Sequence, residues 1–185
     1  PTVAGRSASA GDGGVVQAQT FRRVEGDHRD LRISREIVAG REVEARLWRA
    51  QVGHISAYLL DTDIEGNTPE DRDITFRLYG GDEAHRLRQE IVLGIGGVRA
   101  LRALGLAPAV WHMNEGHAAF LSIELLREQM ARGLTFEAGL EAVAAQCVFT
   151  THTPVAAGHD AFPDGLFIEH FSDIAQSMNV PMEQL

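Results

Sequence analysis

Hydrophobic and polar positions alternate along the first third of the chain, which is the spacing of β-strands. Short alternating runs at 17–24 and 31–38 predict two strands. The alternation is most regular over 41–52, and it predicts a half-buried antiparallel strand. The apolar positions expected on its buried face are Val43, Ala45 and Leu47.

The next apolar run, at 55–60, is continuous instead of alternating, and it is closed by the polar triplet at 61–63. Because strands buried on both faces read as unbroken apolar runs, we expect an interior strand of an α/β sheet here. The polar stretch at 65–72 predicts a loop.

Helical spacing begins after the glycine pair at 80–81. Asp82 predicts the N-cap of a helix, and Gly105 has the position of a C-terminal glycine beyond its last turn. The apolar residues predicted to share one face of this helix are Leu87, Ile91, Ile95, Val98 and Leu101.

Two further short apolar runs, at 109–113 and 147–150, predict buried strands separated by two helices. Asn114 is expected to cap the first of these helices and Thr135 the second. A final helix is expected from about residue 172.

The predicted elements alternate between strands and helices from residue 55 onward, which favours an α/β fold with a Rossmann-like parallel sheet and flanking helices. In such sheets, ligands bind beyond the carboxyl ends of the strands. Polar groups concentrate at three predicted strand ends, 61–63, 113–117 and 151–153. We therefore expect the functional site at this edge.

A glycine-rich run at 94–97 lies inside the predicted helix. It does not match the Gly-x-Gly-x-x-Gly dinucleotide motif, and it does not follow a strand. Glycine inside a helix costs about 1 kcal/mol relative to alanine, so we expect close packing against another element to compensate.

The composition argues against several classes of function. The 185 residues carry a net charge of −9, which argues against nucleic-acid binding. No apolar run approaches the length of a membrane span. A single cysteine, Cys147, favours a reducing, cytoplasmic setting. Residues 1–16 are small and polar and predict a flexible leader, and the length of 17–185 fits one domain or a piece of a larger one.

All 17 basic residues are arginine, and the chain has no lysine. It therefore cannot form a Schiff base with a sugar or with pyridoxal phosphate, nor complete a Walker-type phosphate loop. Any chemistry must come from histidines, carboxylates, hydroxyls, arginines and backbone groups.

The expected strand-edge cluster combines two imidazoles, from His117 and His152, with the carboxylate of Glu115 and short polar side chains. Such groups suit a polyhydroxylated ligand, whose hydroxyls both donate and accept hydrogen bonds. Zinc is the alternative, although the spacing of the histidines is unlike that of common zinc motifs. The histidines that could serve as ligands are His112, His117, His152 and His159.

Several ordered motifs between about residues 43 and 163 resemble the α-glucan phosphorylases that act on glycogen, starch and maltodextrin. The motifs are LYGGD at 78–82, RLRQE at 86–90, HMNEGH at 112–117 and TTHTP at 150–154. WRAQV at 48–52 and YLLDTD at 58–63 are similar to the shorter bacterial branch of that family.

The resemblance implies that phosphate cleaves terminal α-1,4 linkages of a glucan and releases glucose 1-phosphate. It also implies the N-terminal part of a two-domain glycosyltransferase B-type fold. His152 resembles the histidine at the reaction centre. The residues that resemble substrate contacts or the loop gating substrate entry are Asn114, Glu115, His117, Thr151, Tyr79 and Asp82.

The family cofactor is pyridoxal phosphate on a lysine far toward the C-terminus, so the resemblance implies that this chain is an inactive internal segment with no cofactor-binding residue or metal of its own. The implied partners are maltodextrin, inorganic phosphate and a possible second copy. A glucan synthase that uses a nucleotide sugar and a non-catalytic glucan-binding module are the alternatives.

Overall fold

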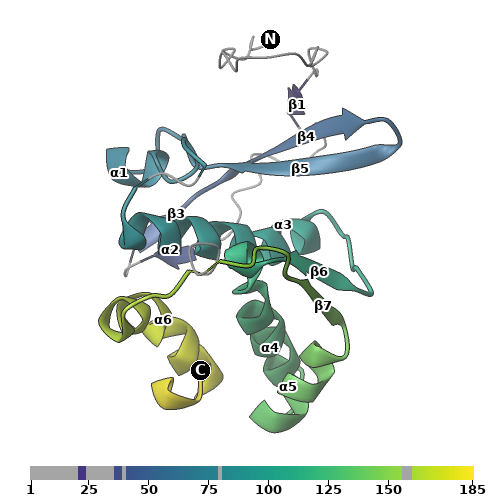
Figure 1. The fold of residues 1–185 in the computed structure, drawn as a ribbon, viewed down its shortest axis with the longest axis vertical. Helices are drawn as coiled ribbons and strands as arrows, with labels where there is room; N and C mark the ends of the chain where they lie inside the picture. The colour runs from purple at the N-terminus through teal and green to yellow at the C-terminus, as the bar shows by residue number, and fades with distance from the viewer. Residues whose placement is uncertain (1–20, 24–35, 39–40, 79–80, 156–159) are drawn as a thin grey trace.

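The computed structural model describes residues 21–23, 36–38, 41–78, 81–155 and 160–185. The leader expected at 1–16 lies outside them. Within the described residues the fold is α/β, as predicted. An antiparallel layer lies above a layer of helices, and a small parallel sheet with further helices lies below it (Figure 1).

The antiparallel layer is a three-stranded sheet in the order β1-β4-β5. β1 spans Phe21–Arg23, β4 spans Arg46–Val52 and β5 spans Ile55–Asp61. A separate antiparallel pair joins β2 (Glu36–Val38) to β3 (Arg41–Val43). The single strand predicted over 41–52 is divided into β3 and β4, which belong to different sheets. Its predicted buried face is confirmed, because all three apolar side chains are at most 5% exposed: Val43, Ala45 and Leu47.

The prediction for residues 55–60 is wrong. β5 pairs antiparallel with β4, and Ile55 at its start is 72% exposed. Val52 pairs with Ile55 across a two-residue turn, in which Gly53 has a φ of +60°. This tight hairpin explains the error, because a two-residue turn can connect only antiparallel strands.

A continuous helical run forms the middle layer. It comprises α2 (Glu83–Ile91), the π-helical turn η1 (Val92–Gly96) and α3 (Gly97–Ala103). Asp82 caps α2 as predicted, since its carboxylate accepts the His85 N–H at 2.9 Å. Four of the five residues predicted for the apolar face are buried, and Leu101 is half-buried; the buried four are Leu87, Ile91, Ile95 and Val98.

Gly94 confirms the packing prediction for the glycine-rich run. A Cβ on Gly94 would lie 2.8 Å from the backbone nitrogen of Leu121, at the start of α4 (Leu121–Ala131). The helical run therefore passes directly against the next helix, and only glycine leaves the necessary space. Gly97 has open space around it and makes no such contact.

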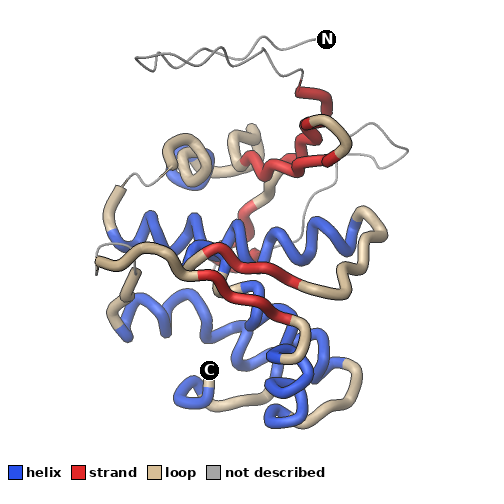
Figure 2. The backbone as a smooth tube through the Cα atoms, turned by 45° about the vertical axis from the view of Figure 1, so that its right-hand side comes forward, coloured by secondary structure: helices blue, strands red, loops and turns tan. Residues whose placement is uncertain are grey.

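The parallel sheet consists of β6 (Trp111–Asn114) and β7 (Cys147–Thr150), with Trp111 opposite Cys147 and Asn114 opposite Thr150 (Figure 2). Both strands were predicted to be buried, and this is only partly correct. Trp111 and Met113 are buried. The intervening side chains of β6 are exposed, and so are two neighbours on β7: His112, Asn114, Val148 and Phe149. β6 therefore packs one face on helices, whereas β7 is exposed at two successive positions and hence on both faces.

Three helices complete the lower part: α4, α5 (Phe136–Ala144) and α6 (Asp164–Met178). Thr135 caps α5 as predicted, by accepting the Ala138 N–H. α6 begins eight residues before the predicted start at 172. Smaller elements are α1 (Pro69–Arg72), inside the predicted loop at 65–72, the 3₁₀ turn η2 (Gly116–Ala118) and the 3₁₀ turn η4 (Met182–Gln184).

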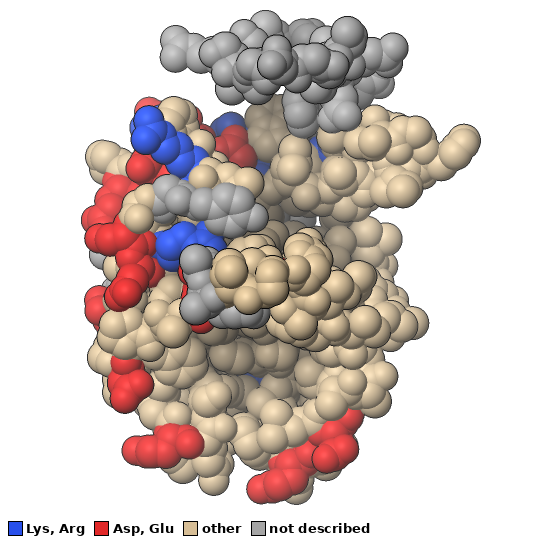
Figure 3. All heavy atoms as spheres, viewed as in Figure 1, with Lys and Arg blue, Asp and Glu red and all other residues tan. Residues whose placement is uncertain are grey.

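Acidic side chains gather along one edge and at the lower end of the face shown in Figure 3, while much of the rest of that face is uncharged. None of the helices in the described ranges has the length and apolar character needed to cross a membrane.

Candidate functional site

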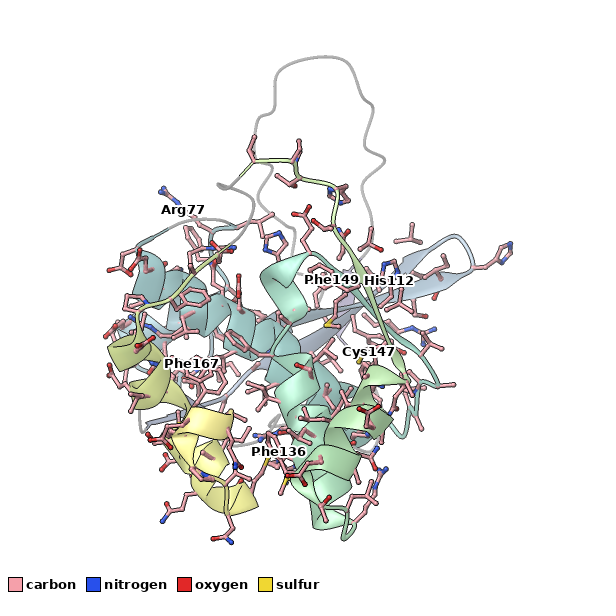
Figure 4. The ribbon with its side chains drawn as sticks, turned by 60° about the horizontal axis from the view of Figure 1, so that its bottom comes forward. Arg77, His112, Phe136, Cys147, Phe149 and Phe167 are labelled. Carbon is pink, nitrogen blue, oxygen red and sulfur yellow. The ribbon has the colours of Figure 1, made fainter. Side chains whose placement is uncertain are left out.

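The carboxyl ends of β6 and β7 lie side by side, which places two of the polar segments predicted from sequence at one edge. The parallel register continues one residue beyond β6, because the Glu115 N–H donates to the carbonyl of Thr150 at 2.8 Å. In Figure 4, His112, Cys147 and Phe149 mark the two strands that lead to this edge.

Glu115 is the central residue of this edge. Its Oε1 accepts the backbone N–H of His152 at 3.0 Å and of Thr153 at 2.7 Å, so one buried carboxylate closes the turn after β7. The hydroxyl of Thr153 and these backbone donors lower the pKa of Glu115 to about 2. Glu115 is therefore ionised at neutral pH.

The expectation that Asn114 caps a helix is wrong. Asn114 is the last residue of β6, and α4 begins only at Leu121, without a side-chain cap. Glu115 has a φ of +60° and a ψ of −160°, a backbone conformation that non-glycine residues rarely adopt. That conformation turns the carboxylate toward β7 instead of leaving it at a helix terminus.

His152 leaves the end of β7 with its imidazole 61% exposed, at the edge where the sequence placed it. Its Nδ1 lies 3.1 Å from Glu115 Oε1, and its Nε2 lies 3.1 Å from Asn114 Oδ1. A carboxylate only accepts hydrogen bonds, so the proton of the neutral ring belongs on Nδ1. Nε2 is then the acceptor, and it is satisfied when the Asn114 amide turns its NH2 group toward the ring.

Thr151 is exposed beside His152. Three of the predicted substrate contacts therefore lie at one edge with the predicted catalytic residue His152, namely Asn114, Glu115 and Thr151. Asp82 is exposed, and its carboxylate caps α2 instead of contacting the described residues of this edge. Tyr79 lies outside the described residues. The first predicted polar triplet, at 61–63, belongs to the antiparallel layer because β5 does not join the parallel sheet.

His117 belongs to a second cluster. Its Nδ1 lies 3.3 Å from Arg86 Nη2 and 3.9 Å from both Glu90 Oε1 and Asp160 Oδ2. Arg86 Nη2 also donates to Asp160 at 2.5 Å and to Glu90 at 3.3 Å. Sequence analysis missed three of these four residues. Arg86 and Glu90 are an i,i+4 pair of opposite charge on α2, which was a readable signal, whereas Asp160 is 74 residues away from Arg86.

Burial raises the pKa of Glu90 to about 8, and a hydrogen bond to Asp160 reinforces the shift. Burial also raises the pKa of Asp160, but the hydrogen bonds from Arg86 and Glu90 outweigh this effect, and the net result is a lowered pKa. At neutral pH the two carboxyl groups therefore hold one proton between them, on Glu90.

The zinc alternative has little geometric support in the described residues. His112 donates to or accepts from Thr150 Oγ1 at 2.6 Å, away from His152 on Glu115 and His117 in the second cluster. His159 lies outside the described residues. The donor atoms of Glu90, His117 and Asp160 lie within 4.8 Å of one another. The guanidinium of Arg86 contacts all three and supplies the positive charge there.

A cavity of about 650 Å³ lies between β5 and the helical run α2–η1–α3. Its lining is mostly apolar and includes Trp111 and Leu121, with Arg86, Glu90 and His117 among its polar groups. Three of the four residues of the second cluster therefore face this cavity. Asn114, Glu115 and His152 do not line it.

Comparison with known proteins gives a consistent set of relatives. Glycogen phosphorylase of Mycobacterium tuberculosis is 54% identical over 127 residues, which cover 65% of this chain and 15% of that protein. Maltodextrin phosphorylase of Thermococcus litoralis is 49% identical over 126 residues, 68% of this chain and 15% of the relative. Glycogen phosphorylase of Aquifex aeolicus is 39% identical over 125 residues, 68% of this chain and 18% of the relative.

The chain thus matches less than a fifth of the length of these relatives. No family model matches the chain. No solved structure matches it either.

Proposed function

We propose that this chain, about two thirds of which is homologous to a segment of glycogen and maltodextrin phosphorylases, is a segment of an α-glucan phosphorylase. The complete enzyme would use inorganic phosphate to cleave the terminal α-1,4 linkage of a glucan or maltodextrin and release glucose 1-phosphate. The α/β architecture and the small parallel sheet support a place in the N-terminal Rossmann-like part of a two-domain glycosyltransferase B-type fold.

The observation that carries the proposal is the position of the His152 imidazole between the side chains of Asn114 and Glu115. An exposed imidazole is held at both ring nitrogens, at a strand edge where ligands bind in α/β sheets. In the proposed reaction Nε2 of His152 exchanges its contact with Asn114 for a hydrogen bond to a sugar hydroxyl at the reaction centre, while Nδ1 stays on Glu115. Asn114, Glu115, His117 and Thr151 line the sugar side, and Tyr79 and Asp82 belong to the loop at its entrance.

Pyridoxal phosphate does not fit the residues of this chain. The cofactor is held through a lysine amine, and all 17 basic residues are arginine. We therefore assign no cofactor contact to this chain and place the cofactor of the complete enzyme elsewhere. What these residues contribute is orientation of the sugar by fixed hydrogen-bonding groups.

The proposed setting is the cytoplasm, where glucan and inorganic phosphate are the partners. Exposed apolar side chains on β7, Val148 and Phe149, support association with further protein surface, including a second copy. The net charge of −9 supports neither a nucleic-acid partner nor an acidic membrane surface. The names of the relatives favour a phosphorylase over a synthase or a binding module.

The test replaces the aligned segment of the Mycobacterium tuberculosis enzyme, 127 residues long, with the corresponding part of this chain. We expect the hybrid enzyme to form glucose 1-phosphate from maltodextrin and phosphate. The unmodified enzyme is the positive control, and a hybrid with His152→Ala is the negative control. A hybrid that unfolds as cooperatively as the parent enzyme but forms no glucose 1-phosphate would contradict the proposed function.

A further inference from the structure

β5 is an outer strand of the antiparallel layer, because the described sheet has the order β1-β4-β5 (Figure 1). The two-residue turn makes Val52 and Ile55 a hydrogen-bonded pair, and such pairs alternate with non-bonded pairs along an antiparallel ladder. The N–H groups of Ser56, Tyr58 and Leu60 therefore point away from β4.

The next N–H group of this series shows the same direction. Thr62 donates its N–H to the hydroxyl of Thr75 at 3.0 Å, outside the β4–β5 ladder. Among the described residues, no backbone carbonyl accepts the N–H groups of Ser56, Tyr58 or Leu60. An outer strand with unpaired backbone groups is a template for a further strand. Proteins commonly protect such edges with charged residues or proline, and the run 55–60 contains neither.

The cavity of about 650 Å³ extends around this free edge. Three successive residues of β5 line it: Tyr58, Leu59 and Leu60. Because successive side chains point to opposite faces of a strand, a space that reaches all three passes around an edge of β5. β4 occupies one edge, so the cavity lies at the other.

The rim of the cavity is apolar and exposed to solvent. Leu59 is 42% exposed, Leu93 of η1 is 51% exposed, and Leu78, which follows α1, is 79% exposed. Contiguous apolar surface of this kind marks an interaction site in soluble proteins. If a strand is added beside β5, every second side chain points toward the helical run α2–η1–α3 and into the cavity.

We propose that a further strand of the complete phosphorylase pairs with the free edge of β5 and places apolar side chains in the cavity. The inference rests on the proposed function. The chain matches only 15% of the Mycobacterium tuberculosis relative, so most of that polypeptide lies outside the matched segment and can supply the strand.

The occupant has a defined chemistry. Its backbone carbonyls accept the N–H groups of Ser56, Tyr58 and Leu60, and its alternate residues are apolar because most of the cavity lining is apolar. A second copy of this chain is less suitable, because each copy carries a net charge of −9 and the two would repel each other.

The backbone pairing is tested by amide hydrogen exchange in the hybrid phosphorylase, with this chain supplying β5 and the helical run. Exchange is resolved to single residues by mass spectrometry. We expect the amides of Tyr58 and Leu60 to exchange at least about tenfold more slowly in the hybrid than in the 185-residue chain. Ala57 and Leu59 are internal controls, because their N–H groups bond β4 and should be protected in both proteins.

Three results would overturn the proposal. The first is rapid exchange of Tyr58 and Leu60 in the hybrid while Ala57 and Leu59 are protected. The second is loss of protection at Ala57 and Leu59 in the hybrid, since the ladder itself would then be absent. The third is equal protection of Tyr58 and Leu60 in the 185-residue chain, because the occupant would then belong to this chain. Protection that grows with protein concentration would identify a second copy.

Filling of the cavity is tested with Leu93→Cys and a thiol reagent, and the modified peptide is quantified separately from that of Cys147. We expect Leu93→Cys to react at least about tenfold more slowly in the hybrid than in the 185-residue chain. Leu134→Cys is the matched control, because Leu134 is 41% exposed and does not line the cavity. In the 185-residue chain the two variants should react at similar rates. Equal rates for Leu93→Cys in the chain and in the hybrid would refute filling of the cavity.

These measurements do not depend on activity. An inactive hybrid with protected Tyr58 and Leu60 would reject the proposed function and leave the interface standing. A hybrid that forms glucose 1-phosphate but exchanges these two amides rapidly would reject the interface and leave the proposed function standing.

Discussion

Replacing His152 with alanine separates a role in the reaction from a role in the fold. The imidazole makes two contacts of 3.1 Å, with Glu115 and Asn114, and it is 61% exposed. Because water can replace an exposed side chain, we expect the free energy of unfolding to fall by less than about 1 kcal/mol. The backbone N–H of His152, which also bonds Glu115, is unaffected by the substitution.

The expected effect on turnover is larger. A neutral hydrogen bond to a sugar hydroxyl that strengthens in the transition state is worth about 1 to 3 kcal/mol, which corresponds to roughly ten- to a hundredfold in kcat. The loss should be seen mainly in kcat and less in KM. The assay is glucose 1-phosphate formation by the hybrid phosphorylase, with thermal unfolding of the same preparations.

His112→Ala provides the matched control, because His112 is also an exposed histidine on this sheet and bonds a threonine hydroxyl. It should change stability by a similar small amount and leave kcat within about twofold. Normal kinetics of His152→Ala together with a large fall in melting temperature would refute the reasoning, since His152 would then serve only the fold.

Three further results are expected from the same geometry. Because the fold raises the pKa of Glu90, its protonated carboxyl group contributes to the free energy of unfolding. This contribution is complete below the ordinary pKa of 4.5 and is lost as the pH rises toward about 8. One pKa unit corresponds to about 1.4 kcal/mol, so even half of this shift makes Glu90→Gln about 2 kcal/mol more stable than wild type at pH 9, measured by urea titration. Equal stabilities of the two proteins would contradict this prediction. Glu124→Ala should cost about 3 kcal/mol, because Arg99 and Arg127 both pair with this fully buried carboxylate, whereas Glu128→Ala, at a more exposed pair, should cost about 1 kcal/mol. The isolated chain should form no borohydride-stable side-chain adduct with pyridoxal phosphate, because it has no lysine, and a stoichiometric adduct in mass spectra would disprove this.

Local features of the fold were predictable from sequence because their causes lie within a few residues. Asp82 and Thr135 cap their helices through N–H groups three residues further on. Gly105 follows the end of a helix with a φ of +72°, a conformation that glycine adopts at low cost. Short-range periodicity and cap chemistry were enough to predict these positions.

Strand pairing was harder to predict, because burial depends on which surfaces meet. The run at 55–60 has the composition of an interior strand, but Gly53 and His54 form the tight turn that returns it along β4. That turn was the readable signal. A two-residue connection excludes a parallel partner for the strands it joins, however apolar the second strand is.

The candidate site was likewise predictable from the sequence only in part. The rule that ligands bind beyond the carboxyl ends of parallel strands correctly predicted that the segments after β6 and β7 lie at one edge. It did not predict that Glu115 would adopt a positive φ and bond the His152 and Thr153 amides, because both depend on a partner strand more than thirty residues away. Asp160 was missed for the same reason.

The turn after β6 connects the two clusters, which explains why it departs from a simple strand-to-helix junction. Glu115 points toward the end of β7, and two residues later His117 points toward α2, with only Gly116 between them. The unfavourable backbone conformation of Glu115 therefore serves to position side chains. It allows one short turn to orient the imidazole of His152 through Glu115 and to place His117 against Arg86.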